Sequence, residues 1–122
     1  MLKKSKKKSV KTLRNKADRL LQELGRKVYK KCIVCGKPMD CMHHFITRGR
    51  SSYLRYYWDN CVPICTPCHV AIELRKCHEI TAKIVFVKGA EWVEKLEKLK
   101  SRYVKTDKAY YEKIINELNK GL

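Results

Sequence analysis

The sequence is short of acidic residues. Asp and Glu together number 12 among 122 residues, against 29 Lys and Arg, and the formal net charge is +17. An excess of this size is too large for the surface of a neutral enzyme and predicts a polyanion as the partner. Residues 1–31 carry 13 of the basic groups and 2 of the acidic ones, so the charge is concentrated at the start of the chain.

Long apolar runs, a signal peptide and internal repeats are also missing. No stretch approaches the roughly 20 apolar residues of a membrane span, and the lysine-rich start lacks the apolar segment that a signal peptide needs. We therefore expect no membrane partner. Hydrophobic residues make up 44% of the chain, and its length predicts one globular domain with a small core.

The seven cysteines are an odd number, which does not suit a set of structural disulfides. Four of them form two Cys-x-x-Cys pairs, Cys32 with Cys35 and Cys65 with Cys68. Four thiolates fill the tetrahedral coordination of a structural Zn²⁺, so we expect one zinc ion per chain, with Gly36 allowing a tight turn under the metal. Such thiols are typical of a reducing compartment, which predicts a cytoplasmic protein.

The three remaining cysteines allow two interpretations. Cys41, Cys61 and Cys77 could join His78 around a second zinc ion. Their irregular spacing favours buried or partly exposed thiols without a metal.

The flanks of the cysteine region differ from it in pattern. Residues 1–8 are predicted to form a flexible basic arm that contacts phosphates, with a solvated tail as the alternative. The arm is supplied by Lys3, Lys4, Lys6, Lys7 and Lys8. Residues 9–31 place apolar side chains on one face of a helix that starts at a candidate N-cap, Ser9.

The helical flanks give three further expectations. Gly25 is expected to weaken the last turns of the first helix. Residues 80–122 predict a helical extension, although residues 80–87 are β-branched enough to fit a strand as well. Thr106-Asp107 is predicted to cap the last helix.

Residues 32–79 hold the candidate chemistry. Met39 to Ile46 predicts a strand, Val62 to Ile64 a second strand, and a short helix is expected from His69. Neighbouring side chains on a strand point to opposite faces, so the adjacent His43 and His44 are expected to have different roles.

His44, Asn60 and His69, framed by the cysteine pairs, resemble the motif of the HNH nucleases. The likeness to the NinG/Rap recombination nucleases of lambdoid bacteriophages covers roughly residues 12–118 and rests on matching offsets of Arg48-Gly49, Leu54-Arg55-Tyr56 and Asp59-Asn60. It implies an α+β fold: a small ββα-metal core with a structural zinc between two Cys-x-x-Cys knuckles, flanked by N- and C-terminal helices.

The resemblance also implies a role for each site residue. The histidine matching His44 is the general base that takes a proton from the attacking water. His43 and His69 match ligands of a catalytic Mg²⁺ or Mn²⁺, and Glu73, one helical turn further, is a candidate third ligand or an ordinary exposed residue. Asn60 matches a residue that braces the loop orienting the general base.

The implied function is hydrolysis of DNA phosphodiester bonds by an HNH endonuclease, on double-stranded DNA or on branched recombination intermediates. A phage-encoded enzyme would act in the host cytoplasm, and a resolvase would need two active sites, which fits a homodimer. One alternative is a non-catalytic zinc-finger DNA-binding protein, which has no use for His44 and Asn60 together. Another is a restriction or homing nuclease, which usually brings an added specificity domain.

Arginines and aromatic residues alternate in the same stretch. The stretch contains the arginines Arg48, Arg50 and Arg55 and the aromatic residues Tyr53, Tyr56, Tyr57 and Trp58. We expect the arginines to bind phosphate and the rings to stack on unpaired bases, with core packing as the alternative for the rings.

Overall fold

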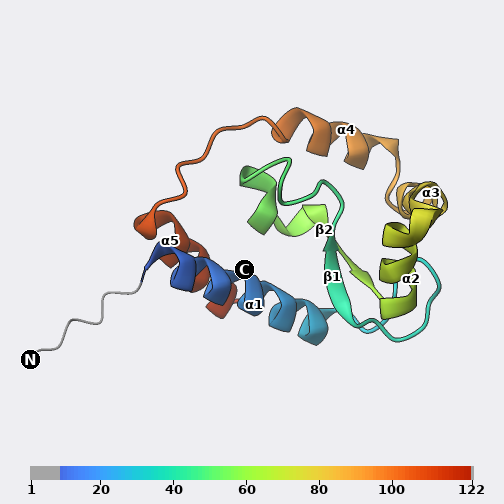
Figure 1. Cartoon of the computed structure of the whole chain (residues 1–122), viewed down its shortest axis with the longest axis horizontal. Coiled ribbons are helices and arrows are strands. Elements are labelled where there is room, and N and C mark those ends of the chain that lie inside the picture. The colour runs from blue at the N-terminus through green and yellow to red at the C-terminus, as the bar shows by residue number, and fades with distance from the viewer. Residues whose placement is uncertain (1–8, 122) are drawn as a thin grey trace, which may run out of the picture.

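A computed structural model of the protein describes residues 9–121, except for the side chains of residues 75–77. Within these residues the fold is α+β, with five α-helices and one two-stranded antiparallel sheet (Figure 1). The predicted α+β class is confirmed at this level. None of the described helices is long and apolar enough to cross a membrane.

The first and last helices lie side by side along one edge of the molecule (Figure 1). Helix α1 (Val10–Val28) follows Ser9, whose side-chain oxygen accepts a hydrogen bond from a first-turn N–H. Helix α5 (Lys108–Asn119) is capped by Asp107 in the same way. Both predicted caps are confirmed, and the buried faces of the two helices share a core.

Helix α1 continues through Gly25, and the glycine has a packing role. A Cβ atom at this position would collide with Cγ and Sδ of Met42, which is itself buried. Gly25 therefore allows α1 to lie close against the strand that carries Met42, and this contact explains a residue that otherwise disfavours helix.

The sheet consists of β1 (Cys41–His44) and β2 (Cys61–Ile64), with His43 opposite Val62 and His44 opposite Cys61. The first strand is shorter than the predicted one, which covered residues 39–46. All of β2 is buried, so the sheet forms the centre of the main core cluster.

The connection between the strands contains two short 3₁₀ helices, η1 (Tyr53–Tyr56) and η2 (Trp58–Asn60). Leu54, Tyr56 and Asn60 are buried there. The aromatic stretch thus forms part of the core. Core packing was one of the two roles predicted for it.

Helix α2 (Thr66–Ala71) begins three residues before the helix that was predicted from His69. Pro67 fits the first turn because a first-turn nitrogen has no intrahelical partner in any case. A π-helical segment, η3 (Ile72–Lys76), continues α2 into α3 (Cys77–Lys88). The segment 80–87 is therefore helical.

Helix α4 (Ala90–Leu99) crosses the opposite side of the core from α1 (Figure 1). Its Trp92 and Leu96 are buried, and the indole N–H of Trp92 donates to the carbonyl of Asp59 over 2.8 Å. An extended linker then returns the chain to α5.

The close approach of α1 and β1 gives a stability prediction. Gly25→Ala is expected to lower the free energy of unfolding by about 1–2 kcal/mol, because the overlap with the buried Met42 side chain outweighs the better helix propensity of Ala. Urea denaturation measures the change. Gly49→Ala is the matched control, since nothing lies within 4 Å of a Cβ there; equal stability of the two variants would contradict the packing role.

Candidate metal centre and catalytic cleft

Cys32, Cys35, Cys65 and Cys68 come together in one group. Their sulfur atoms all lie within 4.8 Å of one another, and the sulfurs of Cys35 and Cys65 are 3.6 Å apart. Four sulfurs at about 2.3 Å from a tetrahedral zinc would be separated by about 3.8 Å. The group is compatible with a structural zinc and offers no open coordination position.

A tight turn presents the first cysteine pair. Gly36 has a φ of 80°, and its N–H donates to the carbonyl of Cys32 over 3.0 Å. The N–H of Val34 donates to the Cys32 sulfur over 3.3 Å. The predicted role of Gly36 in the turn is confirmed, since this φ is costly for any residue with a Cβ.

The environment of the Cys32 sulfur favours a thiolate. Burial raises the pKa of this thiol, but backbone N–H groups of Cys35, Cys65 and Val34 lower it more, so that the pKa falls from 9.0 to about 7. N–H groups aimed at a sulfur stabilise negative charge on it. The turn is therefore suited to a metal-bound thiolate.

A second polar centre lies at the other end of β1, in a cleft of about 400 Å³. The cleft brings together the predicted site residues His43, His44, Arg48, His69 and Glu73. They come from β1, the following loop, α2 and η3, so the fold collects residues that are up to 30 positions apart in the sequence.

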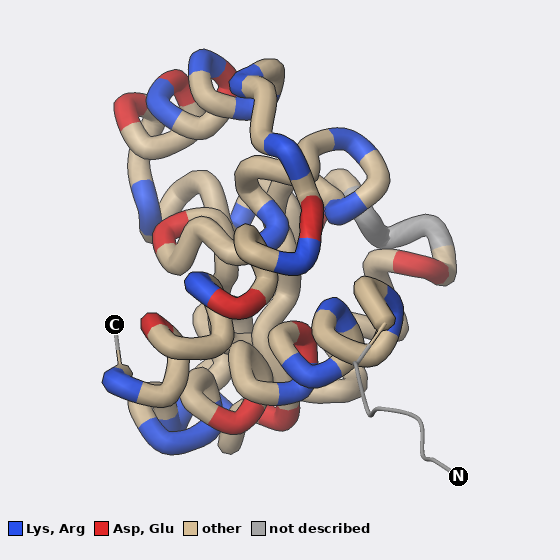
Figure 2. The backbone as a smooth tube through the Cα atoms, turned by 90° about the vertical axis from the view of Figure 1, so that its left-hand side faces the viewer, with Lys and Arg blue, Asp and Glu red and all other residues tan. Residues whose placement is uncertain are grey.

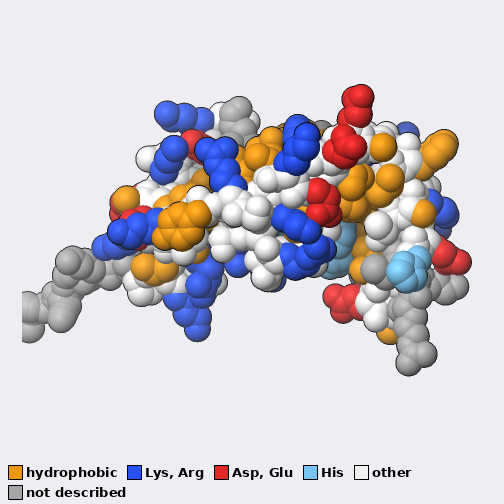
Figure 3. Space-filling model, turned by 90° about the horizontal axis from the view of Figure 1, so that it is seen from above, with side chains coloured by type: hydrophobic (Ala, Val, Ile, Leu, Met, Phe, Trp, Pro, Cys, Tyr) orange, Lys and Arg blue, Asp and Glu red, His pale blue; other side chains and the backbone are white. Residues whose placement is uncertain are grey.

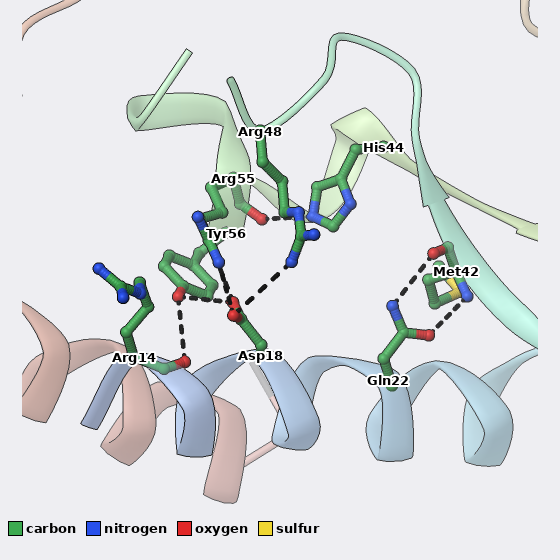
Figure 4. Close-up of polar contacts among 8 residues, drawn as sticks. All are labelled: Arg14, Asp18, Gln22, Met42, His44, Arg48, Arg55 and Tyr56. Atoms are coloured by element: carbon green, nitrogen blue, oxygen red, sulfur yellow. Dashed lines mark hydrogen bonds and ion pairs between the residues drawn. The ribbon is translucent and has the colours of Figure 1, made fainter. Parts of the chain in front are cut away.

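His44 is held through one ring nitrogen. Its Nε2 lies 2.9 Å from the carbonyl oxygen of Arg55 (Figure 4). A carbonyl oxygen only accepts, so Nε2 carries the proton and Nδ1 keeps a free lone pair. Burial lowers the pKa of His44 below its usual 6.5, against the hydrogen bond to Arg55, which raises it. The neutral ring has the form required of a general base.

His43 faces a different neighbour. Its ring packs edge-on against the ring of His69, with centroids 5.4 Å apart. Burial, followed by the charges of His69 and His44, lowers the pKa of His43 to about 4. The two adjacent histidines have different partners, but both line the same cleft, so they are not separated onto opposite sides of the strand. Their different roles stay a prediction.

The histidine cleft is a more open arrangement than the cysteine group. Among the described residues, the four cysteines are the only set of three or more His, Cys, Asp and Glu whose ligand atoms lie within 4.8 Å of one another. His43 and His69 are therefore a pair of nitrogen donors. Glu73 also lines the cleft, but it does not form a group of three mutually close ligand atoms with them. Such a pair leaves positions for water and substrate oxygens on any ion it holds.

Asn60 braces the connection that holds His44 in place. The side chain is fully buried, its Oδ1 accepts from the N–H of Ile46 over 2.9 Å, and its Nδ2 donates to the carbonyls of Ile46 and Leu54 over 2.9 and 3.2 Å. These bonds fix both ends of the loop between β1 and η1. The carbonyl that binds His44 belongs to Arg55, the residue directly after Leu54.

Asp18 of α1 is a supporting residue that the sequence did not reveal. Its carboxylate accepts from Nε and NH2 of Arg55 over 3.0 and 2.6 Å and from the hydroxyl of Tyr56 over 2.7 Å (Figure 4). Arg48 is 3.7 Å from the same carboxylate. Asp18 is the only acidic residue among residues 1–22. An isolated carboxylate in a basic segment is the sequence signal that points to it.

Gln22 is a second supporting residue, one helical turn after Asp18. Its Oε1 accepts from the N–H of Met42 over 2.7 Å, and its Nε2 donates to the carbonyl of Met42 over 3.1 Å (Figure 4). A side-chain amide satisfies both backbone groups of a residue adjacent to His43 on the free edge of β1. Nothing in the local sequence pattern identifies this contact.

The predicted DNA-binding residues are in different environments. The side chain of Arg48 is 53% exposed at the cleft, whereas that of Arg55 is 21% exposed and held by Asp18. Arg50 is exposed on the loop after β1. Contact of these arginines with DNA stays a prediction, and Lys3, Lys4, Lys6, Lys7 and Lys8 lie outside the described residues.

The other cysteines do not form a described metal group. Cys61 is buried, and burial raises the pKa of its thiol to about 12. The sulfur of Cys41 lies 3.9 Å from Nδ1 of His69. The side chain of Cys77 lies outside the described residues, and His78 is exposed.

The four-cysteine group predicts about one mole of tightly bound zinc per mole of chain. Cys32→Ser is expected to lose the zinc and most of the cooperative unfolding transition, because metal binding and folding are coupled in such sites. Elemental analysis and thermal denaturation measure both effects. Cys41→Ser, which alters a thiol outside the group, should keep its zinc; a zinc-free wild type of unchanged stability would contradict this prediction.

The bonds of Asn60 predict a large effect of its truncation. Asn60→Ala removes the partner of the buried N–H and carbonyl of Ile46 and one of the two donors to the carbonyl of Leu54, and should cost about 3 kcal/mol of unfolding free energy. Asn15→Ala, an exposed substitution on α1, is the control and should have little effect. Denaturant titration compares the two, and a loss below about 1 kcal/mol for Asn60→Ala would exclude a bracing role.

No protein-family model, curated protein or solved structure matches this chain. The resemblance to the HNH nucleases therefore stays a prediction from the residues quoted above. The four-cysteine group and the histidine cleft are properties of this chain's own geometry, and the function proposed for it depends on them.

Proposed function

We propose that this protein is a metal-dependent endonuclease of the HNH type that hydrolyses phosphodiester bonds in DNA. The observation that carries the proposal is the cleft in which a neutral, oriented His44 lies beside the imidazole pair of His43 and His69. A base, two donors for an ion and the cation of Arg48 meet in one place that is open to solvent.

His44 supplies the proton acceptor. The Arg55 carbonyl holds Nε2 and its proton, so Nδ1 takes the proton from the attacking water while the ring becomes a cation. Burial keeps the ring neutral before this step. General bases of this kind typically contribute a factor of about 10²–10⁴ to the rate.

His43 and His69 are the residues that would hold the catalytic ion. Their rings lie next to each other with centroids 5.4 Å apart and line the same cleft, so they would offer two nitrogen donors to one ion. Mg²⁺ or Mn²⁺ there would offset charge on the scissile phosphate and the leaving oxygen. Glu73 lines the same cleft and would add a carboxylate oxygen that these ions favour.

The surroundings of the cleft support a nucleic-acid substrate. The order of β1, β2 and α2, joined by the cysteine group, is that expected of a ββα-metal core. Arg48 lines the cleft with more than half of its side chain exposed, so its guanidinium is placed to bind a phosphate beside His44. The net charge of +17 favours a polyanion over the whole surface.

Basic residues also continue beyond the cleft. In Figure 2, Lys and Arg occur along the helices and loops of the side shown, and acidic positions interrupt them. The substrate class proposed is therefore double-stranded or branched DNA, with recombination intermediates as the branched form to test.

Cleavage of supercoiled plasmid and of a four-way junction with Mg²⁺ or Mn²⁺ tests the proposal. Wild type should nick at least one of these substrates, and His44→Ala should be about 10²–10⁴-fold slower because it lacks the proton acceptor. His78→Ala is the matched control, since His78 is an exposed histidine outside the cleft. It should cleave at the wild-type rate.

Two outcomes would contradict the proposal. Equal loss of activity in the two histidine variants would remove His44 from the chemistry. Tight DNA binding by wild type without cleavage of any substrate, under either metal, would favour the alternative of a non-catalytic zinc-containing DNA-binding protein.

A further inference from the structure

The linker between α4 and α5 forms two adjoining cavities with the aromatic segment η1. One, of about 600 Å³, lies between the linker and the loop of residues 50–52. The other, of about 400 Å³, lies between the linker, η1 and α5. Arg102, Tyr103 and Val104 line both cavities, so the two adjoin at the linker.

The smaller cavity is an aromatic pocket. Tyr53, Tyr57, Tyr103 and Tyr110 contribute rings to its wall, and those of Tyr53 and Tyr57 are 5.7 Å apart. Tyr103 is 82% exposed, although it lies at the edge of a pocket made of other tyrosines. A planar ligand could therefore reach the face of a ring that the core does not use.

The larger cavity is a basic groove. Arg50, Lys100, Arg102 and Lys105 line it together with hydroxyl groups, and Asp107 is its one acidic lining residue. The Asp107 carboxylate caps α5 through one oxygen, and its other oxygen lies 3.9 Å from Nζ of Lys105, whose side chain is 77% exposed. Figure 3 shows this upper face, where blue Lys and Arg side chains lie next to exposed orange ones.

Arg102 joins the two environments. Its guanidinium carbon lies 4.8 Å from the centre of the Tyr53 ring, which is a cation–π contact. An arginine stacked on a tyrosine beside further cations provides both a flat surface and positive charge. The aromatic pocket also contains Lys113 and a single carboxylate, Glu117.

We propose that the aromatic pocket and the basic groove bind unpaired nucleotides of single-stranded DNA. A base would stack on the exposed ring of Tyr103, while the phosphates on either side would lie along Arg50 and Lys105. Single-strand sites combine these two features, because every base offers a π-face and every nucleotide a negative charge. The bases of an intact duplex are stacked on one another and do not offer a face to such a pocket.

The loop after β1 connects this site to the histidine cleft. Thr47 and Arg48 line the cleft, whereas Arg50, Ser51 and Ser52 line the basic groove. The groove and the proposed active site are therefore lined by the same loop, and DNA with an unpaired segment is the substrate class that would occupy both. This inference extends the proposed function, but it concerns binding and is tested without cleavage.

The test is binding of fluorescent oligothymidylate, without added Mg²⁺ or Mn²⁺, at one fixed salt concentration. Tyr103→Ala should weaken binding at least about fivefold, which is the lower range for the loss of one base–aromatic stack. Tyr103→Phe keeps the ring and should bind like wild type. Phe86→Ala is the matched control: Phe86 is 89% exposed on α3 and lines neither cavity, so its loss should leave binding unchanged.

An abasic strand of equal length separates stacking from charge. Wild type should bind it more weakly than oligothymidylate, and Tyr103→Ala should not weaken that binding further. The site is refuted if Tyr103→Ala and Phe86→Ala behave alike, if the abasic strand binds as tightly, or if blunt duplex is preferred over the single strand. Normal cleavage in Tyr103→Ala without a binding defect would refute this site alone, whereas Tyr103-dependent binding without cleavage would refute only the nuclease.

Discussion

The hydrogen bonds of Asn60 are the constraint on which the candidate site depends. A fully buried amide satisfies three backbone groups, two at the end of β1 and one in η1. Without the Asn60 side chain, buried backbone groups in the connection between the strands would lose hydrogen-bond partners, because no regular β-ladder pairs them there. Because the carbonyl of Arg55 follows directly, the same constraint fixes the acceptor that selects the tautomer of His44.

Helix α1 provides the second support, and it does so along one face. Asp18 and Gln22 are one turn apart and bind the two sides of the cleft: Asp18 holds η1 through Arg55, and Gln22 holds β1 through Met42. Gly25, nearly one turn further, allows the helix to approach the strand closely. A predominantly basic helix thus contributes its single early carboxylate to orientation, and this carboxylate also offsets charge among clustered arginines.

Local patterns in the sequence predicted the features that depend on local spacing. The caps at Ser9 and Asp107, the helical periodicity of α1 and the two Cys-x-x-Cys pairs each follow from residues within a few positions of one another. Conversely, the pairing of Asp18 with Arg55 joins residues 37 positions apart. No periodicity encodes such a partner, so the contact becomes visible only when the helix is placed against the loop.

The difference between the predicted and observed start of α2 also arises from a contact between residues that are distant in the sequence. The helix before the cleft was expected from His69, but α2 begins at Thr66, where the carboxylate of Asp40 accepts from the Thr66 N–H over 2.6 Å. Cys65, the residue at the cap position, makes no side-chain cap bond, and its sulfur belongs to the four-cysteine group. Asp40, the residue directly before β1, thus caps a helix that begins 26 positions later. This is a tertiary contact, and a capping rule based on neighbouring residues does not include it.

The segment η1 contributes to both the histidine cleft and the aromatic pocket. His44 is held by η1 through the Arg55 carbonyl, and η1 also forms the wall of the aromatic pocket through Tyr53. One short segment, bonded to Asp18 through Arg55 and Tyr56, therefore carries both the acceptor of His44 and one wall of the aromatic pocket. If both proposals hold, a ligand that displaced η1 would move the two together, and binding in the pocket would be coupled to the orientation of His44 through a segment of four residues.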